Sequence, residues 1–374
     1  MKKAICFLVS FLIILCVCSV SVFAENEKYE LENFQKEVSE ELFSSMSEEV
    51  SEALDAIGIN DLDFKSVYNF SFGSVLSYFT PQLKEKGSRV LSVFFELLTC
   101  VMLLSVFGVI LEDGKNKKLF SLFSSALIAV IILPSVQNVL TSGISVLKIS
   151  NTFIVSYVPV LTLILSFSGN AASAMLFNSF LLGVCEIMSA VINNVVVQFI
   201  GCFICLSVTY SLDENLRVQR LISAVNKAVT LILTSAASLF SGILTVKNVM
   251  AVSLDSLSVR GVRFLLSSFI PIIGSSISEA YSSVLGSINL IKGSVSVIGI
   301  IAIVVINLPV ITETFMYYLS FSALAYISEI SCCNQVSDVL RAIASVMRML
   351  IVLIVFEMFV LVISTGIILT IKNA

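Results

Sequence analysis

Four glutamates lie within or near the ends of long apolar stretches, where an ionised carboxylate costs several kcal/mol if it faces lipid. They are Glu96, Glu186, Glu279 and Glu357. Each carboxylate needs compensation: it can face a polar path, pair with Arg263, Lys292 or Arg348, or bind a proton. We predict that some of the four line a conduit or a subunit contact. The alternative is a structural hydrogen bond between helices.

Two prolines and a glycine complete the set of candidate conduit or helix-contact residues. Pro159 and Pro271 each fall within an apolar stretch, and a proline in a membrane helix frees backbone groups that can face a cavity. Gly274 permits a bend or a close helix approach, as do other glycines after Pro271. These are Gly286, Gly293 and Gly299. Amide side chains such as Asn178 and Asn307 are expected to join helices by hydrogen bonds.

The chain lacks the residues of common enzyme mechanisms. It contains no histidine, which removes the usual general base and metal ligand, and no P-loop, GxSxG or HExxH pattern occurs. Cys202 and Cys205 have the spacing of a redox motif, but they lie in an apolar stretch without a βαβ pattern, which favours packing. We predict that the chain is not an enzyme and has no catalytic, cofactor-binding or metal-binding residues.

The elements that position these residues are membrane helices. Of the 374 residues, 57% are hydrophobic and 13% are charged, and the mean hydropathy is +1.02, so lipid rather than water is the expected solvent. We predict an all-α, polytopic integral membrane bundle with about 8–10 hydrophobic segments. The apolar windows are approximately 90–111, 119–140, 152–168, 171–192, 195–212, 228–246, 264–285, 295–311, 313–331 and 349–371.

The N-terminal part has the pattern of an exported segment. Residues 1–24 are predicted to be a signal peptide cleaved after Ala24, with an uncleaved anchor as the alternative. Residues 25–88 then form an acidic extracytoplasmic segment, which argues against nucleic-acid binding. An apolar helical stripe runs from Leu31 to Ile57 and can dock on the membrane domain, a partner helix or a second copy. Residues 59–88 are predicted to be a loop-rich connector, because Thr80-Pro81 signals a turn.

The rest of the chain divides into a first membrane hairpin, residues 89–150, and two related units, residues 150–246 and 262–371. Phe153 to Pro159 resembles Leu265 to Pro271, and both are followed by a basic segment and a long apolar helix. Chance similarity between apolar sequences is the alternative. Loops rich in lysine and arginine tend to stay in the cytoplasm, and their placement here favours two units of parallel orientation. This arrangement places the basic loop 247–263 outside the cytoplasm, against the rule.

One segment resembles a known family. Ser258 to Gly274, followed by Ser278-Glu279-Ala280-Tyr281 and Val284-Leu285-Gly286, is similar to stage III sporulation protein AE, as is Tyr157-Val158-Pro159 with Ser168-Gly169. The resemblance implies a multi-pass protein of endospore-forming bacteria, in the mother-cell membrane that faces the forespore. It also implies partners: other stage III sporulation proteins, including a separate ATPase and ring-forming extracytoplasmic proteins. The family supplies no catalytic residues to transfer.

Two functional hypotheses follow. The first is a membrane component that forms or supports a transport conduit between the two cells, required for forespore development and energised by the partner ATPase. The second is a non-conducting scaffold that anchors the extracytoplasmic rings. Either can include self-association of this chain in the bilayer.

Overall fold

The computed structural model is helical throughout the part of the chain that it describes. That part comprises residues 33, 35–44, 46–59, 72–110, 114–191, 274–331 and 333–370, with isolated positions between 227 and 245. The helices are α2 (Glu48–Ala56), α4 (Phe72–Ile110), α5 (Gly114–Phe167), α6 (Ala171–Val191), α9 (Gly274–Ile330) and α10 (Asn334–Thr370), and residues 35–44 are also helical. The described residues include no strand, so the all-α prediction is confirmed.

Four helices are long and apolar enough to cross a membrane. Their qualifying stretches are Gly73–Gly108, Leu119–Phe167, Leu285–Ile330 and Asn334–Gly366. The chain is therefore a helical membrane protein, as its composition predicts. The signal-peptide prediction for residues 1–24 and the topology prediction for loop 247–263 both lie outside the described residues.

Two helices join windows that the sequence separates. α5 joins window 119–140 to residues 152–167 of the next window, and α9 joins window 295–311 to residues 313–330 of the next. The expected break in α5 is absent because residues 141–151 contain no proline and pack against α10. Gly143 lies so close to Leu350 that a Cβ atom added to the glycine would be 2.7 Å from Leu350 Cδ2. Pro309 lies inside α9 without ending it. Windows 195–212 and 228–246 fall mainly outside the described residues.

The connector predicted at residues 59–88 is also corrected. α4 begins at Phe72 and passes through Pro81. A proline disturbs the preceding turn of a helix, but tertiary packing can hold the helix together across it. Here Val75 and Phe79 are buried, at 7% and 3% exposed, whereas Pro81 faces outward. Burial of the apolar face therefore outweighs the local turn signal.

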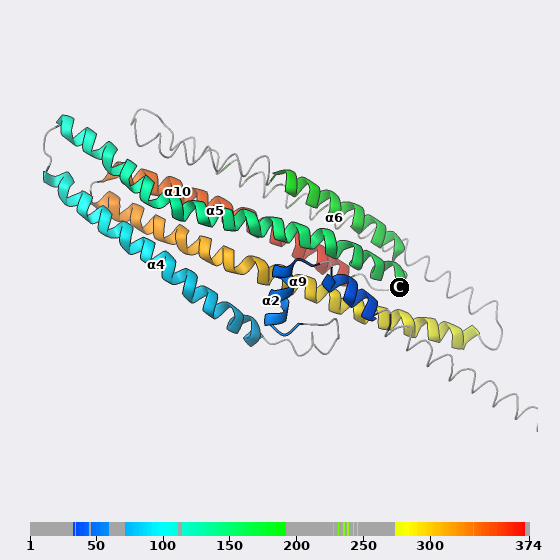
Figure 1. Ribbon diagram of the computed structural model, residues 1–374. Helices are drawn as coiled ribbons and strands as arrows, with labels where there is room; N and C mark the ends of the chain where they lie inside the picture. Colours follow the sequence, from blue (N-terminus) through cyan, green and yellow to red (C-terminus); the bar gives the residue numbers. More distant parts are fainter. Residues whose placement is uncertain are drawn as a thin grey trace, which may run out of the picture.

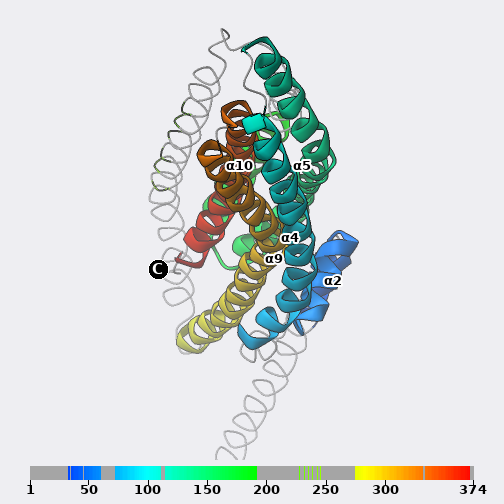
Figure 2. The same ribbon diagram turned by 90° about the vertical axis from the view of Figure 1, so that its left-hand side faces the viewer.

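The four long helices run side by side (Figures 1 and 2). α4 runs parallel to α9, because Lys86 contacts Glu313 and Ser105 Oγ donates a hydrogen bond to the Ser331 carbonyl. α5 and α10 run in the opposite direction to α9. α6 packs against α5, and α2 packs against α9.

The buried apolar residues form two clusters along this bundle. The first apolar cluster lies where α2, the N-terminal part of α9 and the C-terminal parts of α5 and α10 meet, with α6 beside them. The second apolar cluster lies among α4, the first half of α5, the C-terminal half of α9 and the first half of α10. The N-terminal stripe is buried in the first apolar cluster through Val38, Leu42, Met46, Val50, Leu54 and Ile57. Of the three docking alternatives, the structure thus shows packing on the chain's own membrane helices.

Candidate functional site

A layer of buried polar side chains separates the two apolar clusters. Each of the helices α5, α9 and α10 contributes to both clusters and has a short gap between its two contributions. The gaps lie between Leu147 and Phe153, between Val305 and Val310, and between Ile354 and Val360. Ser150, Asn307 and Glu357 lie in these three gaps, and they are 0%, 0% and 2% exposed. We call these three residues, together with the neighbouring Asn151, the polar layer.

Contacts place the members of the polar layer at one level of the bundle. Asn307 Nδ2 donates hydrogen bonds to Ser150 Oγ at 2.9 Å and to the Ile303 carbonyl at 2.8 Å, which ties α9 to α5. α5 meets α10 where Gly143 faces Leu350. Ser150 follows Gly143 by seven residues, and Glu357 follows Leu350 by seven residues. Seven residues are about two helical turns, so Ser150 and Glu357 return to the same side at about the same level.

The polar layer holds acceptor oxygens without donors. Both carboxylate oxygens of Glu357 and the Oδ1 atoms of Asn151 and Asn307 are buried and lack a hydrogen-bond partner. Buried polar atoms are nearly always paired, because each unpaired acceptor has lost its water without gaining a substitute. Of the nine buried side-chain atoms without a hydrogen-bond partner among the described residues, four belong to the polar layer.

An ion pair with a buried carboxylate joins α4 to α9. Lys86 Nζ of α4 is 2.8 Å from Glu313 Oε2 of α9, and the Glu313 side chain is only 7% exposed. Sequence reasoning did not select either residue. Lys86 falls in the segment that the sequence assigned to the exterior, and Glu313 lies at the edge of an apolar window, so neither stood out as an isolated charge.

The other candidate carboxylates do not join Glu357. Glu96 of α4 and Glu186 of α6 are exposed on their helices, whereas Glu357 is buried. Glu279 belongs to α9, but its side chain is not among those described. Of the suggested cationic partners, Arg348 lies over the Tyr318 ring, with its guanidinium carbon 5.6 Å from the ring centroid. A conduit role for the four glutamates stays a prediction.

The proline and glycine candidates fall at different places in the helices. Pro159 lies inside α5 on an exposed position and does not end the helix. Gly274 is the first residue of α9, and Pro271 lies outside the described residues. Among the other glycines, only Gly299 makes the expected close approach: an ideal Cβ there would lie 2.4 Å from Tyr157 Cζ, whereas Gly286 and Gly293 have nothing within 4 Å.

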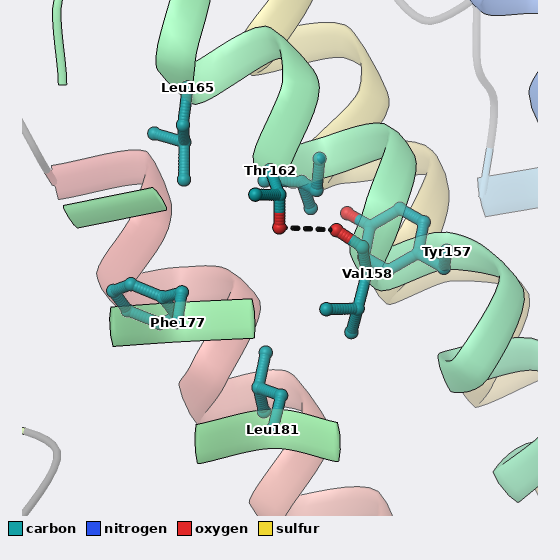
Figure 3. A pocket seen from close by; sticks show the side chains of 7 residues that line it. Tyr157, Val158, Thr162, Leu165, Phe177 and Leu181 are labelled. Atoms are coloured by element: carbon teal, nitrogen blue, oxygen red, sulfur yellow. Dashed lines mark hydrogen bonds between the residues drawn. The ribbon is translucent and has the colours of Figure 1, made fainter. Parts of the chain in front are cut away.

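A small cavity lies between α5 and α6. It is lined by residues that include Tyr157, Leu161, Phe177 and Leu181, and its volume is about 10 Å³, which holds at most about one water molecule (Figure 3). The Thr162 hydroxyl donates to the Val158 carbonyl at 2.7 Å, so it does not offer a free polar group to the cavity. This cavity is too small to pass a solute.

Comparison with known proteins identifies the family. No solved structure matches the chain. The chain is similar to stage III sporulation protein AE of Bacillus subtilis (strain 168), with 23% identity over 255 residues, which is 67% of this chain and 64% of that protein. It thus spans just under two thirds of the length of that curated relative. A family model described as stage III sporulation protein AE matches residues 49–371. The chain therefore belongs to the stage III sporulation protein AE family.

Proposed function

We propose that this chain is a non-enzymatic membrane subunit of a sporulation complex and that it supports a transport conduit between mother cell and forespore. The observation that carries the proposal is the length of its apolar helices. Leu119–Phe167 has 49 residues, which at 1.5 Å per residue is about 74 Å, against a hydrocarbon thickness of about 30 Å. Even a helix tilted by 40° needs only about 26 residues to cross.

Lipid alone therefore leaves part of this apolar surface uncovered. Large exposed apolar side chains occur at both ends of α5, for example Leu119 at 66% and Phe167 at 58%. Apolar surface of this extent outside the bilayer requires cover by protein, from this chain, from other copies or from partners. This requirement favours a subunit of an assembly over an isolated membrane protein.

The outward face of α2 supports an extracytoplasmic partner. While Val50 and Leu54 are buried, the acidic residues of the helix remain exposed. These are Glu48, Glu49, Glu52 and Asp55. A basic surface on a ring-forming extracytoplasmic protein fits this face by charge. In the same proposal the separate ATPase supplies energy, and the chain lies in the mother-cell membrane that faces the forespore.

The scaffold alternative also has an observation in its favour. Among the described residues the long helices pack closely, and the cavity between α5 and α6 has a volume of only about 10 Å³. A conduit supported by this chain would therefore run along a surface shared with another subunit. A scaffold needs no such path and depends only on the chain's abundance and assembly.

Alanine substitutions in a sporulating host separate the two functions. Glu96→Ala, at an exposed position within the apolar stretch of α4, and Glu279→Ala are expected to impair forespore development while protein abundance and co-purification with the other stage III proteins stay normal. Glu85→Ala, at an exposed position of α4 before that stretch, is the matched control and is expected to leave development intact. Normal development in both test variants, at normal abundance, would favour the scaffold.

A further inference from the structure

We propose that the polar layer binds one monovalent alkali cation, Na⁺ or K⁺, between α5, α9 and α10. The layer consists of Ser150, Asn151, Asn307 and Glu357, and none of the comparisons assigns it a ligand. The proposal concerns occupancy of this chain alone and does not depend on whether the chain supports a conduit.

The first argument is the surplus of acceptors. Glu357 contributes two unpaired carboxylate oxygens, and Asn151 and Asn307 contribute one unpaired amide oxygen each. The Asn307 amide nitrogen is already used, because it donates to Ser150 Oγ and to the Ile303 carbonyl. A proton on Glu357 would turn one of its oxygens into a donor to one other acceptor, which leaves two of the four acceptors unpaired. A hard cation satisfies several oxygens at once, because oxygen ligands surround it.

The second argument is convergence from three helices. The 2.9 Å hydrogen bond between Asn307 and Ser150 fixes α9 against α5. The contact of Gly143 with Leu350, two turns before Ser150 and Glu357, fixes α10 against α5. The two apolar clusters support the same alignment independently. On each of the three helices, the polar residue lies in the gap between the first and the second cluster.

The third argument is charge. Glu357 is 2% exposed, and an ionised carboxylate at this burial requires a positive partner. Three described basic side chains come nearest to this level along the helices. Lys86 pairs with Glu313, and Arg348 lies over the Tyr318 ring. Lys148 is exposed. A single carboxylate is neutralised by a single monovalent ion, whereas Ca²⁺ sites usually gather several carboxylates.

The polar layer thus combines carboxylate, amide and hydroxyl oxygens. Such hard oxygen donors suit an alkali cation.

The test uses the full chain purified in detergent, with unfolding followed by helical circular dichroism. N-methylglucamine chloride is replaced by NaCl or by KCl at constant total chloride. We expect a saturable rise of the unfolding temperature on the order of a few degrees with at least one of the two salts. The salt that acts identifies the ion. A melting curve that neither salt shifts in a saturable way would overturn the proposal.

Variants locate the effect in the polar layer. Glu357→Gln keeps the side-chain shape and is expected to abolish the cation-dependent rise of the unfolding temperature. Asn307→Leu is expected to raise the cation concentration at half saturation at least tenfold. Glu96→Gln, an exposed carboxylate on α4, is the control and should keep the full shift. A full shift in folded Glu357→Gln would show that the ion binds elsewhere.

A direct binding measurement covers the case in which Glu357→Gln does not fold. Equilibrium binding of radioactive sodium to the unaltered chain, with competition by unlabelled KCl, counts the sites. One site per chain supports the proposal. No saturable binding of sodium and no KCl-dependent shift of the melting curve would exclude it.

Discussion

At the scale of single residues, Tyr157 joins α5 to α9. Its side chain is 3% exposed, and its hydroxyl donates to the Val295 carbonyl at 3.1 Å. The ring stacks on Phe153, with centroids 5.3 Å apart, and lies against the backbone of Gly299. The absence of a side chain at Gly299 allows this approach, so the contact depends on the glycine as well as on the tyrosine.

Replacing that glycine is expected to separate the helices. In Gly299→Ala the new methyl group would lie 2.4 Å from Tyr157 Cζ, and we expect a loss of about 1–3 kcal/mol of unfolding free energy. Gly293→Ala is the matched control: it has nothing within 4 Å, so the better helix propensity of alanine should leave stability unchanged or raise it by about 0.5–1 kcal/mol. Thermal unfolding in detergent measures both. Equal melting temperatures would contradict the close contact.

The Lys86–Glu313 pair is the second residue-scale feature to test. Lys86→Met leaves the Glu313 carboxylate without its partner at 7% exposure, and we expect a loss of about 2–3 kcal/mol. This is below the value for fully buried pairs because Lys86 is 23% exposed. The double variant Lys86→Met, Glu313→Met should recover most of the loss, since no buried charge remains.

An exposed pair supplies the comparison. Arg89 Nη2 is 3.1 Å from Glu85 Oε1, with both side chains more than half exposed, so Arg89→Ala should cost about 0–1 kcal/mol. The difference between the two pairs is measured by denaturant unfolding in mixed micelles. Similar losses for Lys86→Met and Arg89→Ala would show that the Lys86–Glu313 pair is not buried in the folded protein.

At the scale of elements, the continuity of α5 decides how the bundle is built. A helix that ran only from residue 119 to 140 would stop within the second apolar cluster, before Val146 and Leu147. Because α5 continues to Phe167, the same helix contributes to both apolar clusters and carries Ser150 between them. The polar layer exists only because three helices pass through this level without interruption.

A proline placed in the middle of α5 tests this continuity. Thr141 is exposed, so a substitution there changes the backbone without disturbing a buried side chain. We expect Thr141→Pro to cost about 3 kcal/mol, because proline removes a helical hydrogen bond and clashes with the preceding turn. Thr141→Ala should be neutral or slightly stabilising. If residues 141–151 formed a loop instead, both variants would melt at nearly the same temperature.

At the scale of the whole molecule, the apolar surface determines where lipid can lie. α4 exposes large apolar side chains from Leu91 to Ile110, a stretch of about 30 Å, which matches the hydrocarbon thickness. The exposed charged residues Lys84, Glu85 and Arg89 lie just before this stretch. This part of α4 therefore has the length and the charged boundary of a membrane-crossing segment.

Single cysteines in a cysteine-free background test that placement. Leu103→Cys lies in the exposed apolar stretch of α4, at a position that is 57% exposed in the isolated chain. In intact membranes it should resist a membrane-impermeant maleimide and react only after detergent is added. Lys84→Cys, beyond the charged boundary, should react in membranes from one side. Rapid labelling of both positions would mean that lipid does not cover this stretch.

The sequence by itself determined the helical class, the membrane environment and the family, because each depends on properties that run along the chain. Apolar windows set which residues can lie in lipid, and local motifs carry the family resemblance. It also selected Glu357 as a carboxylate in an apolar setting. The same criterion selected Glu96 and Glu186, which the structure places on outward faces, because an apolar window does not show toward which neighbour a side chain points.

Only the tertiary structure decided which helices continue and which residues meet. Pro81 and Pro309 lie within helices because packing on buried faces outweighs the local break. Three features each join positions more than a hundred residues apart: the pairing of Lys86 with Glu313, the contact of Gly299 with Tyr157, and the level that Ser150 shares with Asn307 and Glu357. Their physical cause is the register of one helix against another, which side-chain packing across the interface sets and which local sequence does not encode.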